Sequence, residues 1–84
     1  PQEMSEYIAT FHTHLSALIS CRSLTALGAE AQMMPVPRAL SSSCGTCVRY
    51  TAEDTCKDAM DVDLESIALS LGDEKYELIY KAEE

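Results

Sequence analysis

The chain has 84 residues and a mass of 9.2 kDa, which is enough for one domain with a small hydrophobic core. A hydrophobic fraction of 46% argues against wholesale disorder, and no apolar run approaches the roughly 18 residues of a membrane-spanning helix. Fourteen acidic against six basic residues give a formal net charge of −8, which disfavours nucleic acid and anionic membranes as partners. We expect a single domain over residues 1–84, with residues 1–5 as a disordered tail.

The first element is a strand over residues 6–12, because the segment is rich in β-formers and is apolar enough on both faces to lie inside a sheet. Thr13 can cap a helix that follows from about residue 14 to residue 27 and ends at Gly28. A second strand over 29–34 is then predicted. It stops at two prolines, Pro35 and Pro37, which remove hydrogen-bond donors from a sheet.

Residues 38–45 are polar and indicate a loop, and residues 46–51 (TCVRYT) return to strand character. The acidic segment 52–63 is expected to be a solvated face with a helical turn. Four apolar residues then recur at the i, i+3, i+4, i+7 spacing of a helix that ends at Gly72, namely Leu64, Ile67, Ala68 and Leu71. A last strand is predicted over 75–81.

This order predicts an α+β fold of the ferredoxin-like type, β-α-β-β-α-β, with an antiparallel sheet and two helices on one face. In that topology the first two strands are parallel and the third lies between them. The end of the first strand, the start of the first helix and the 38–47 loop should then meet at one end of the sheet.

Four cysteines (Cys21, Cys44, Cys47 and Cys56) are the chemically informative residues. Since the first residues carry no secretion-signal pattern, we expect reduced thiols in a cytoplasmic protein. The segment Cys44-Gly45-Thr46-Cys47 places two sulfurs where they can form a disulfide or bind one metal. The residues that follow it predict a strand, so the helix that activates a thioredoxin-type cysteine is missing. A reactive Cys44, a metal ligand and an inert loop all remain open.

Residues around Cys44 could support a reactive thiol. Arg38 lies on the same loop and can help to hold a thiolate, and the positive end of the first helix should face the same region. Ser42 and Ser43 offer hydroxyl donors for a bound anion or persulfide, although loop serines are more often just loop-compatible residues. Cys21 and Cys56 are expected to lie away from this site.

His12 and His14 suggest an alternative metal site. With Cys44 and Cys47 they would complete a tetrahedral set for zinc. The simpler interpretation is a strand–helix junction whose polar residues cap exposed backbone.

The run from Met34 to Gly45, MPVPRALSSSCG, resembles the signature of the selenium/sulfur carrier protein-like family. The resemblance covers roughly residues 6–81, with residues 35–45 as its specific part. It implies that Cys44 carries the sulfur or selenium and that Pro37, Arg38 and Gly45 shape its loop. Cys47 has no counterpart in that pattern.

The leading hypothesis is therefore a carrier without enzymatic activity or cofactor, which holds sulfur or selenium on Cys44 as a persulfide or perselenide and delivers it between donor and acceptor proteins. The alternative is a metal-binding (zinc) or thiol-redox module that uses Cys44 and Cys47 with His12 and His14. A third hypothesis is an interaction module with incidental cysteines. A homodimer is also expected, through an apolar sheet-face patch of Tyr7, Ala9, Tyr76, Leu78 and Tyr80.

Overall fold

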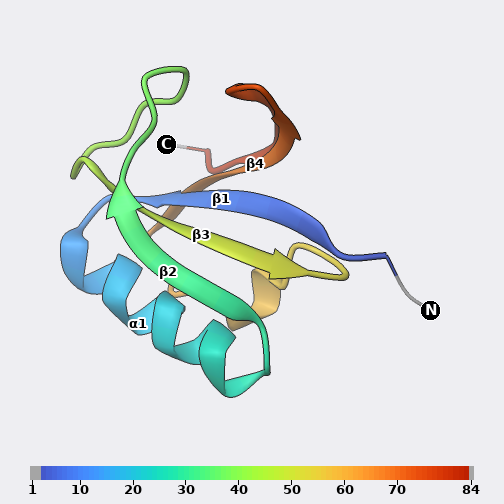
Figure 1. Ribbon diagram of the computed structural model, residues 1–84. Helices are drawn as coiled ribbons and strands as arrows, with labels where there is room; N and C mark the ends of the chain where they lie inside the picture. Colours follow the sequence, from blue (N-terminus) through green and yellow to red (C-terminus); the bar gives the residue numbers. More distant parts are fainter. Residues whose placement is uncertain (1–2, 84) are drawn as a thin grey trace.

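The computed structural model describes residues 3–83, which form one five-stranded sheet and one α-helix (Figure 1). The elements in chain order are β1 (Ser5–Phe11), α1 (His14–Ala26), β2 (Glu30–Pro35), β3 (Thr46–Ala52), the short 3-10 helix η1 (Lys57–Ala59), β4 (Leu64–Gly72) and β5 (Lys75–Lys81). The strand order is β2-β3-β1-β4-β5, and each pair of neighbours is antiparallel. Of the predicted tail, residues 1–2 lie outside the described residues, and Ser5 belongs to β1.

The elements in the first half of the chain form where its sequence predicts them. The Thr13 hydroxyl caps α1 by accepting a hydrogen bond from the Ser16 N–H at 3.1 Å, and Gly28 adopts a φ of 94° just beyond the helix. β3 pairs with both β1 and β2, so these two strands are parallel to each other with β3 between them. The crossover through α1 therefore has the expected arrangement.

The ferredoxin-like prediction is wrong, because residues 64–72 form the strand β4 and not a second helix. The spacing of the apolar residues predicts a helix wrongly because β4 contains a bulge. Thr10 pairs with Ser66 and Phe11 pairs with Leu64, so Glu65 is an extra residue in the ladder. The bulge lets Leu64 and Ile67, three residues apart as on a helix, join the same buried cluster.

The core is built around β1, in which every residue from Tyr7 to Phe11 is buried. On one face α1 covers a cluster that includes Tyr7, Ala9 and Phe11. On the other face Ile8 and Thr10 are buried as well. Figure 1 shows α1 on one side of the sheet, whereas the segment between β2 and β3 and the β4–β5 hairpin rise on the other side.

The apolar patch that suggested a homodimer does not form. Tyr7 and Ala9 are buried in the cluster under α1, whereas Leu78 is paired with Ala68 and is 52% exposed. The position of the last strand explains the difference: a patch shared by β1 and β5 needs the two strands side by side, but β5 pairs with β4 at the edge of the sheet. This patch therefore supplies no argument for a dimer.

Two substitutions in β4 test the strand against the helix. A helix would place Ile67 and Leu71 on one buried face, whereas in the strand Ile67 is fully buried and Leu71 is 58% exposed. We expect Ile67→Ala to lower the free energy of unfolding by about 2–5 kcal/mol, and Leu71→Ala to change it by only about 0.5 kcal/mol. Urea denaturation of both variants measures the difference, and equal losses would contradict the strand.

Candidate functional site

The loop between β2 and β3 carries Cys44 and is closed at its base by backbone contacts. The Val36 N–H donates to the Gly45 carbonyl at 3.1 Å, and Gly45 has a φ of 75°, which a residue with a side chain rarely adopts. The Leu40 N–H donates to the Pro37 carbonyl at 3.0 Å and forms a turn further out in the loop. The glycine after Cys44 thus permits the tight return into β3.

Ser42 fastens this loop to the end of β1 and also contacts Cys44. Its hydroxyl donates to the Phe11 carbonyl at 3.1 Å and accepts from the Cys44 N–H at 3.4 Å. The Cys44 sulfur lies 3.8 Å from the same hydroxyl oxygen and 3.5 Å from the Thr46 carbonyl oxygen, to which the thiol can donate. The thiol is half-buried and is held within a network of polar groups.

Ser43 is held by Glu65, a residue that the sequence analysis did not single out. The Glu65 carboxylate accepts from the Ser43 N–H at 3.1 Å and from the Ser43 hydroxyl at 2.7 Å. The His12 ring lies 3.3 Å from the Ser43 hydroxyl oxygen and 3.6 Å from Glu65 Oε2. Burial alone would raise the pKa of Glu65, but the Ser43 hydrogen bonds and the nearby His12 outweigh it and lower that pKa below its ordinary value.

The second thiol of the motif, Cys47, lies inside the sheet and not on the loop. It is fully buried opposite Thr10, and its thiol donates to the Pro35 carbonyl at 3.7 Å. Burial raises the pKa of Cys47 to about 11; nearby Cys44 adds to the rise, whereas Arg49 opposes it. At neutral pH this thiol is protonated, and it is shielded from reagents in solution.

The two histidines approach the cysteine loop without forming a metal site. His14 Nδ1 lies 3.4 Å from the Thr46 hydroxyl oxygen, and His12 faces Ser43 and Glu65. Within residues 3–83, no three His, Cys, Asp or Glu side chains come together in a way that could hold a metal ion. The predicted zinc set is therefore not assembled, although the loop does meet the end of β1 and the start of α1 as expected.

The remaining residues of interest lie at the margin or outside this site. Arg38 is exposed, and in the part of the chain that the structure describes it makes no hydrogen bond or ion pair with Cys44 or Glu65. Cys21 lies on α1 and packs against the core. Cys56 precedes η1, and burial, together with a hydrogen bond to Asp54, raises the pKa of its thiol.

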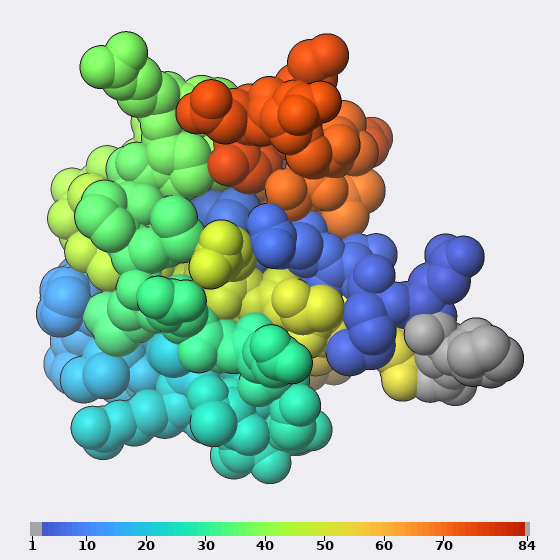
Figure 2. Space-filling view, viewed as in Figure 1, coloured from blue at the N-terminus to red at the C-terminus, as the bar shows by residue number. Residues whose placement is uncertain are grey.

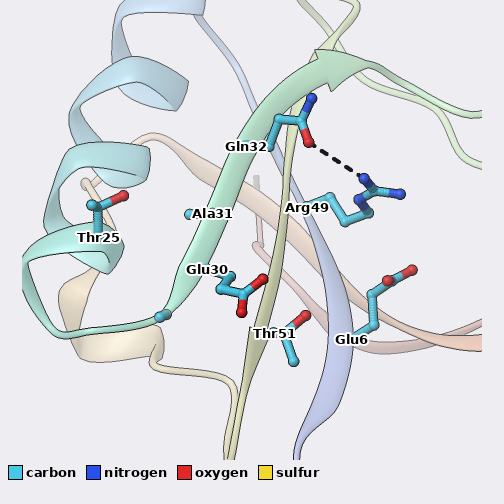
Figure 3. Close-up of a pocket in the computed structure, with 8 residues that line it drawn as sticks. Glu6, Thr25, Glu30, Ala31, Gln32, Arg49 and Thr51 are labelled. Carbon is cyan, nitrogen blue, oxygen red and sulfur yellow. Dashed lines mark hydrogen bonds between the residues drawn. The ribbon is translucent and has the colours of Figure 1, made fainter.

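Several hollows open on the surface of the described residues, and one of them adjoins the cysteine loop. A hollow of about 410 Å³ lies between the loop and the β4–β5 hairpin, which form adjacent lobes in Figure 2. It is lined by Ala39, Leu40, Ser41, Glu65, Ser66, Tyr76, Leu78 and Lys81. Another hollow, of about 510 Å³, lies at the opposite end of the sheet, where Gln32 accepts a hydrogen bond from Arg49 at 3.4 Å (Figure 3). No cysteine lines either hollow.

Comparison with known proteins gives one match. The family described as "Putative Se/S carrier protein-like" matches residues 6–62, which is more than half of the chain and includes the whole cysteine loop. No curated protein and no solved structure matches the chain. In the described residues, no helix is long and apolar enough to cross a membrane.

The geometry predicts that the four thiols react unequally. Limiting iodoacetamide at neutral pH should modify Cys44 first, because it lies on a loop, whereas Cys21 and Cys56 pack against the core and the pKa of Cys56 is raised. Cys47 should stay unmodified because its sulfur is buried and protonated. Peptide mass spectrometry of the native protein measures the order. Earlier labelling of Cys21, Cys47 or Cys56 would contradict the assignment of Cys44 as the reactive thiol.

Proposed function

The chain belongs to the Se/S carrier protein-like family, and from this membership we propose that it holds a sulfur or selenium atom on Cys44 and delivers it to a partner protein. The observation that carries the proposal is the placement of Cys44. Its thiol lies on a partly exposed loop inside the matched segment, whereas Cys47 is buried and protonated. Of the two thiols in the motif, Cys44 is the one that a donor can reach.

Loading requires only the Cys44 thiolate and a donor persulfide. The thiolate attacks the outer sulfur of the donor, a new S–S bond forms at Cys44, and the donor leaves as a thiolate. The donor sulfur that leaves takes the bonding electrons, so the step needs no external oxidant. Ser42 contributes by holding the Cys44 backbone and by placing its hydroxyl beside the sulfur.

Delivery repeats the same exchange in the opposite direction. A thiolate of the acceptor attacks the outer sulfur on Cys44, and Cys44 leaves as the thiolate that began the cycle. A selenium atom bound to Cys44 is transferred by the same displacement. The protein therefore needs protein partners on both sides of the reaction and acts as a carrier, not as an enzyme that alters its cargo.

The position of Cys47 supports storage of the cargo more than its release. A neighbouring thiolate could attack the persulfide on Cys44, form a Cys44–Cys47 disulfide and expel hydrosulfide. Because the Cys47 thiol is protonated, buried and hydrogen-bonded to the Pro35 carbonyl, it is a poor nucleophile for that attack. A carrier benefits from such an arrangement, since the bound atom then leaves only to an external acceptor.

Incubation of the reduced protein with a small-molecule persulfide donor tests the proposal. We expect intact-mass spectrometry to show a gain of one sulfur atom per chain, located on Cys44 and removed by dithiothreitol. Cys44→Ser should abolish the gain.

Cys47→Ser serves as the matched variant, since it removes the other thiol of the motif. It should load as well as the wild type and keep its sulfur for at least as long. Wild-type protein that forms a Cys44–Cys47 disulfide instead of a persulfide would contradict the carrier function and favour the redox module. Bound zinc that is lost on Cys47→Ser would favour the metal-binding alternative.

A further inference from the structure

The bulge in β4 places a carboxylate beside the cysteine loop. Without the extra residue Glu65, the side chains of β4 would alternate regularly between the two faces of the sheet. Bulges commonly redirect a side chain next to a functional site. Here the Glu65 backbone carbonyl accepts a hydrogen bond from the Ala82 N–H at 2.9 Å, while its side chain reaches Ser43.

The contact between Glu65 and Ser43 has two hydrogen bonds and one charged partner. One carboxylate oxygen accepts from the Ser43 N–H and the other from its hydroxyl. Hydrogen bonds to an ionised group are shorter and stronger than neutral ones, and two at once fix orientation as well as position. Ser43 is the residue directly before Cys44, so whatever fixes Ser43 restricts the thiol as well.

We propose that Glu65 is a positioning residue for Cys44, which acts through Ser43 and holds it most strongly when the carboxylate is ionised. The purpose of this positioning rests on the proposed carrier function, whereas the contact between Glu65 and Ser43 does not depend on it. Glu65 lies beyond the segment 6–62 that the family matches, so it joins the site from the C-terminal hairpin. The Ser42 hydroxyl is hydrogen-bonded to the Phe11 carbonyl, so Ser42 and Glu65 together attach the loop to the neighbouring strands β1 and β4.

The groups around the Glu65 carboxylate determine how the contact depends on pH. His12 at the end of β1 approaches it at 3.6 Å, Cys44 follows Ser43, and Lys81 and Tyr76 of β5 line the same hollow. The nearby His12 favours the ionised form of the Glu65 carboxylate. Because the pKa of folded Glu65 is lowered, the contact is present above the ordinary glutamate pKa and is lost as the pH falls through the folded value.

A titration followed by NMR tests the need for charge. In uniformly ¹⁵N-labelled protein we expect the Ser43 amide resonance to move with a midpoint below the ordinary glutamate pKa. Glu65→Gln, which keeps the shape of the side chain, should abolish this titration, and Glu77→Gln on the neighbouring strand β5 should leave it unchanged. A Ser43 titration that persists in Glu65→Gln would overturn the proposal.

Two rates test the effect on the loop. In Glu65→Ala, exchange of the Ser43 amide hydrogen should accelerate roughly tenfold or more, because a charge-assisted hydrogen bond is lost. The rate at which iodoacetamide alkylates Cys44 should also differ from the wild-type rate. Cys47 should stay protected from alkylation if the variant is folded. Glu65→Gln should restore part of the protection because its amide can still bond Ser43. Wild-type rates in Glu65→Ala would overturn the proposal.

These measurements use no sulfur donor, so they are independent of the carrier function. Changed rates in Glu65→Ala with no sulfur uptake by the wild type would reject the carrier and keep Glu65 as a positioning residue. Normal sulfur uptake by the wild type with unchanged rates in Glu65→Ala would keep the carrier function and reject Glu65 as a positioning residue.

Discussion

The position of β1 determines most of the structure. This strand hydrogen-bonds to β3 along one edge and to β4 along the other, and both of its faces are buried from Tyr7 to Phe11. A strand that is fixed on four sides has little freedom, so the point at which the chain leaves it is fixed as well. The Phe11 carbonyl and the His12 ring, both at that point, are contacted by the two serines that directly precede the cysteine.

The thiol-bearing loop combines a rigid base with polar attachments. Gly45 and Val36 close the base through backbone contacts, whereas Ser42 and Ser43 attach the outer part through side chains. Hydrogen bonds of this kind are individually modest in water and exchange readily with solvent. A loop held in this way can keep its thiol oriented when alone and still yield when a partner approaches.

Much of this arrangement is predictable from sequence because it depends on local signals. The β-forming residues of segment 6–12, the cap at Thr13 and the glycine at residue 28 each act within a few residues, and together they place the cysteine loop near His12 and His14. The helix predicted from Leu64 fails because a bulge imitates helical spacing. Glu65 is missed for the same reason: an acidic residue on a predicted surface helix gives no sign that it will face a loop more than twenty residues away.

The placement of Cys47 shows a similar limit. A C-x-x-C spacing suggests two equivalent thiols, but the return of the chain into β3 puts one sulfur on the loop and the other inside the sheet opposite Thr10. Spacing alone could not reveal this, since the burial of Cys47 follows from its place in β3, between β1 and β2.

The strand order also leaves two free edges, β2 and β5, and both are poorly suited to pairing with another copy of the sheet. β2 ends at Pro35, which has no N–H to donate, and β5 carries the charged, exposed residues Lys75, Glu77 and Lys81 within its seven residues. Edges of this kind discourage the growth of continuous sheets between molecules. Copies of the protein can therefore be present at high local concentration without joining through the edges of their sheets.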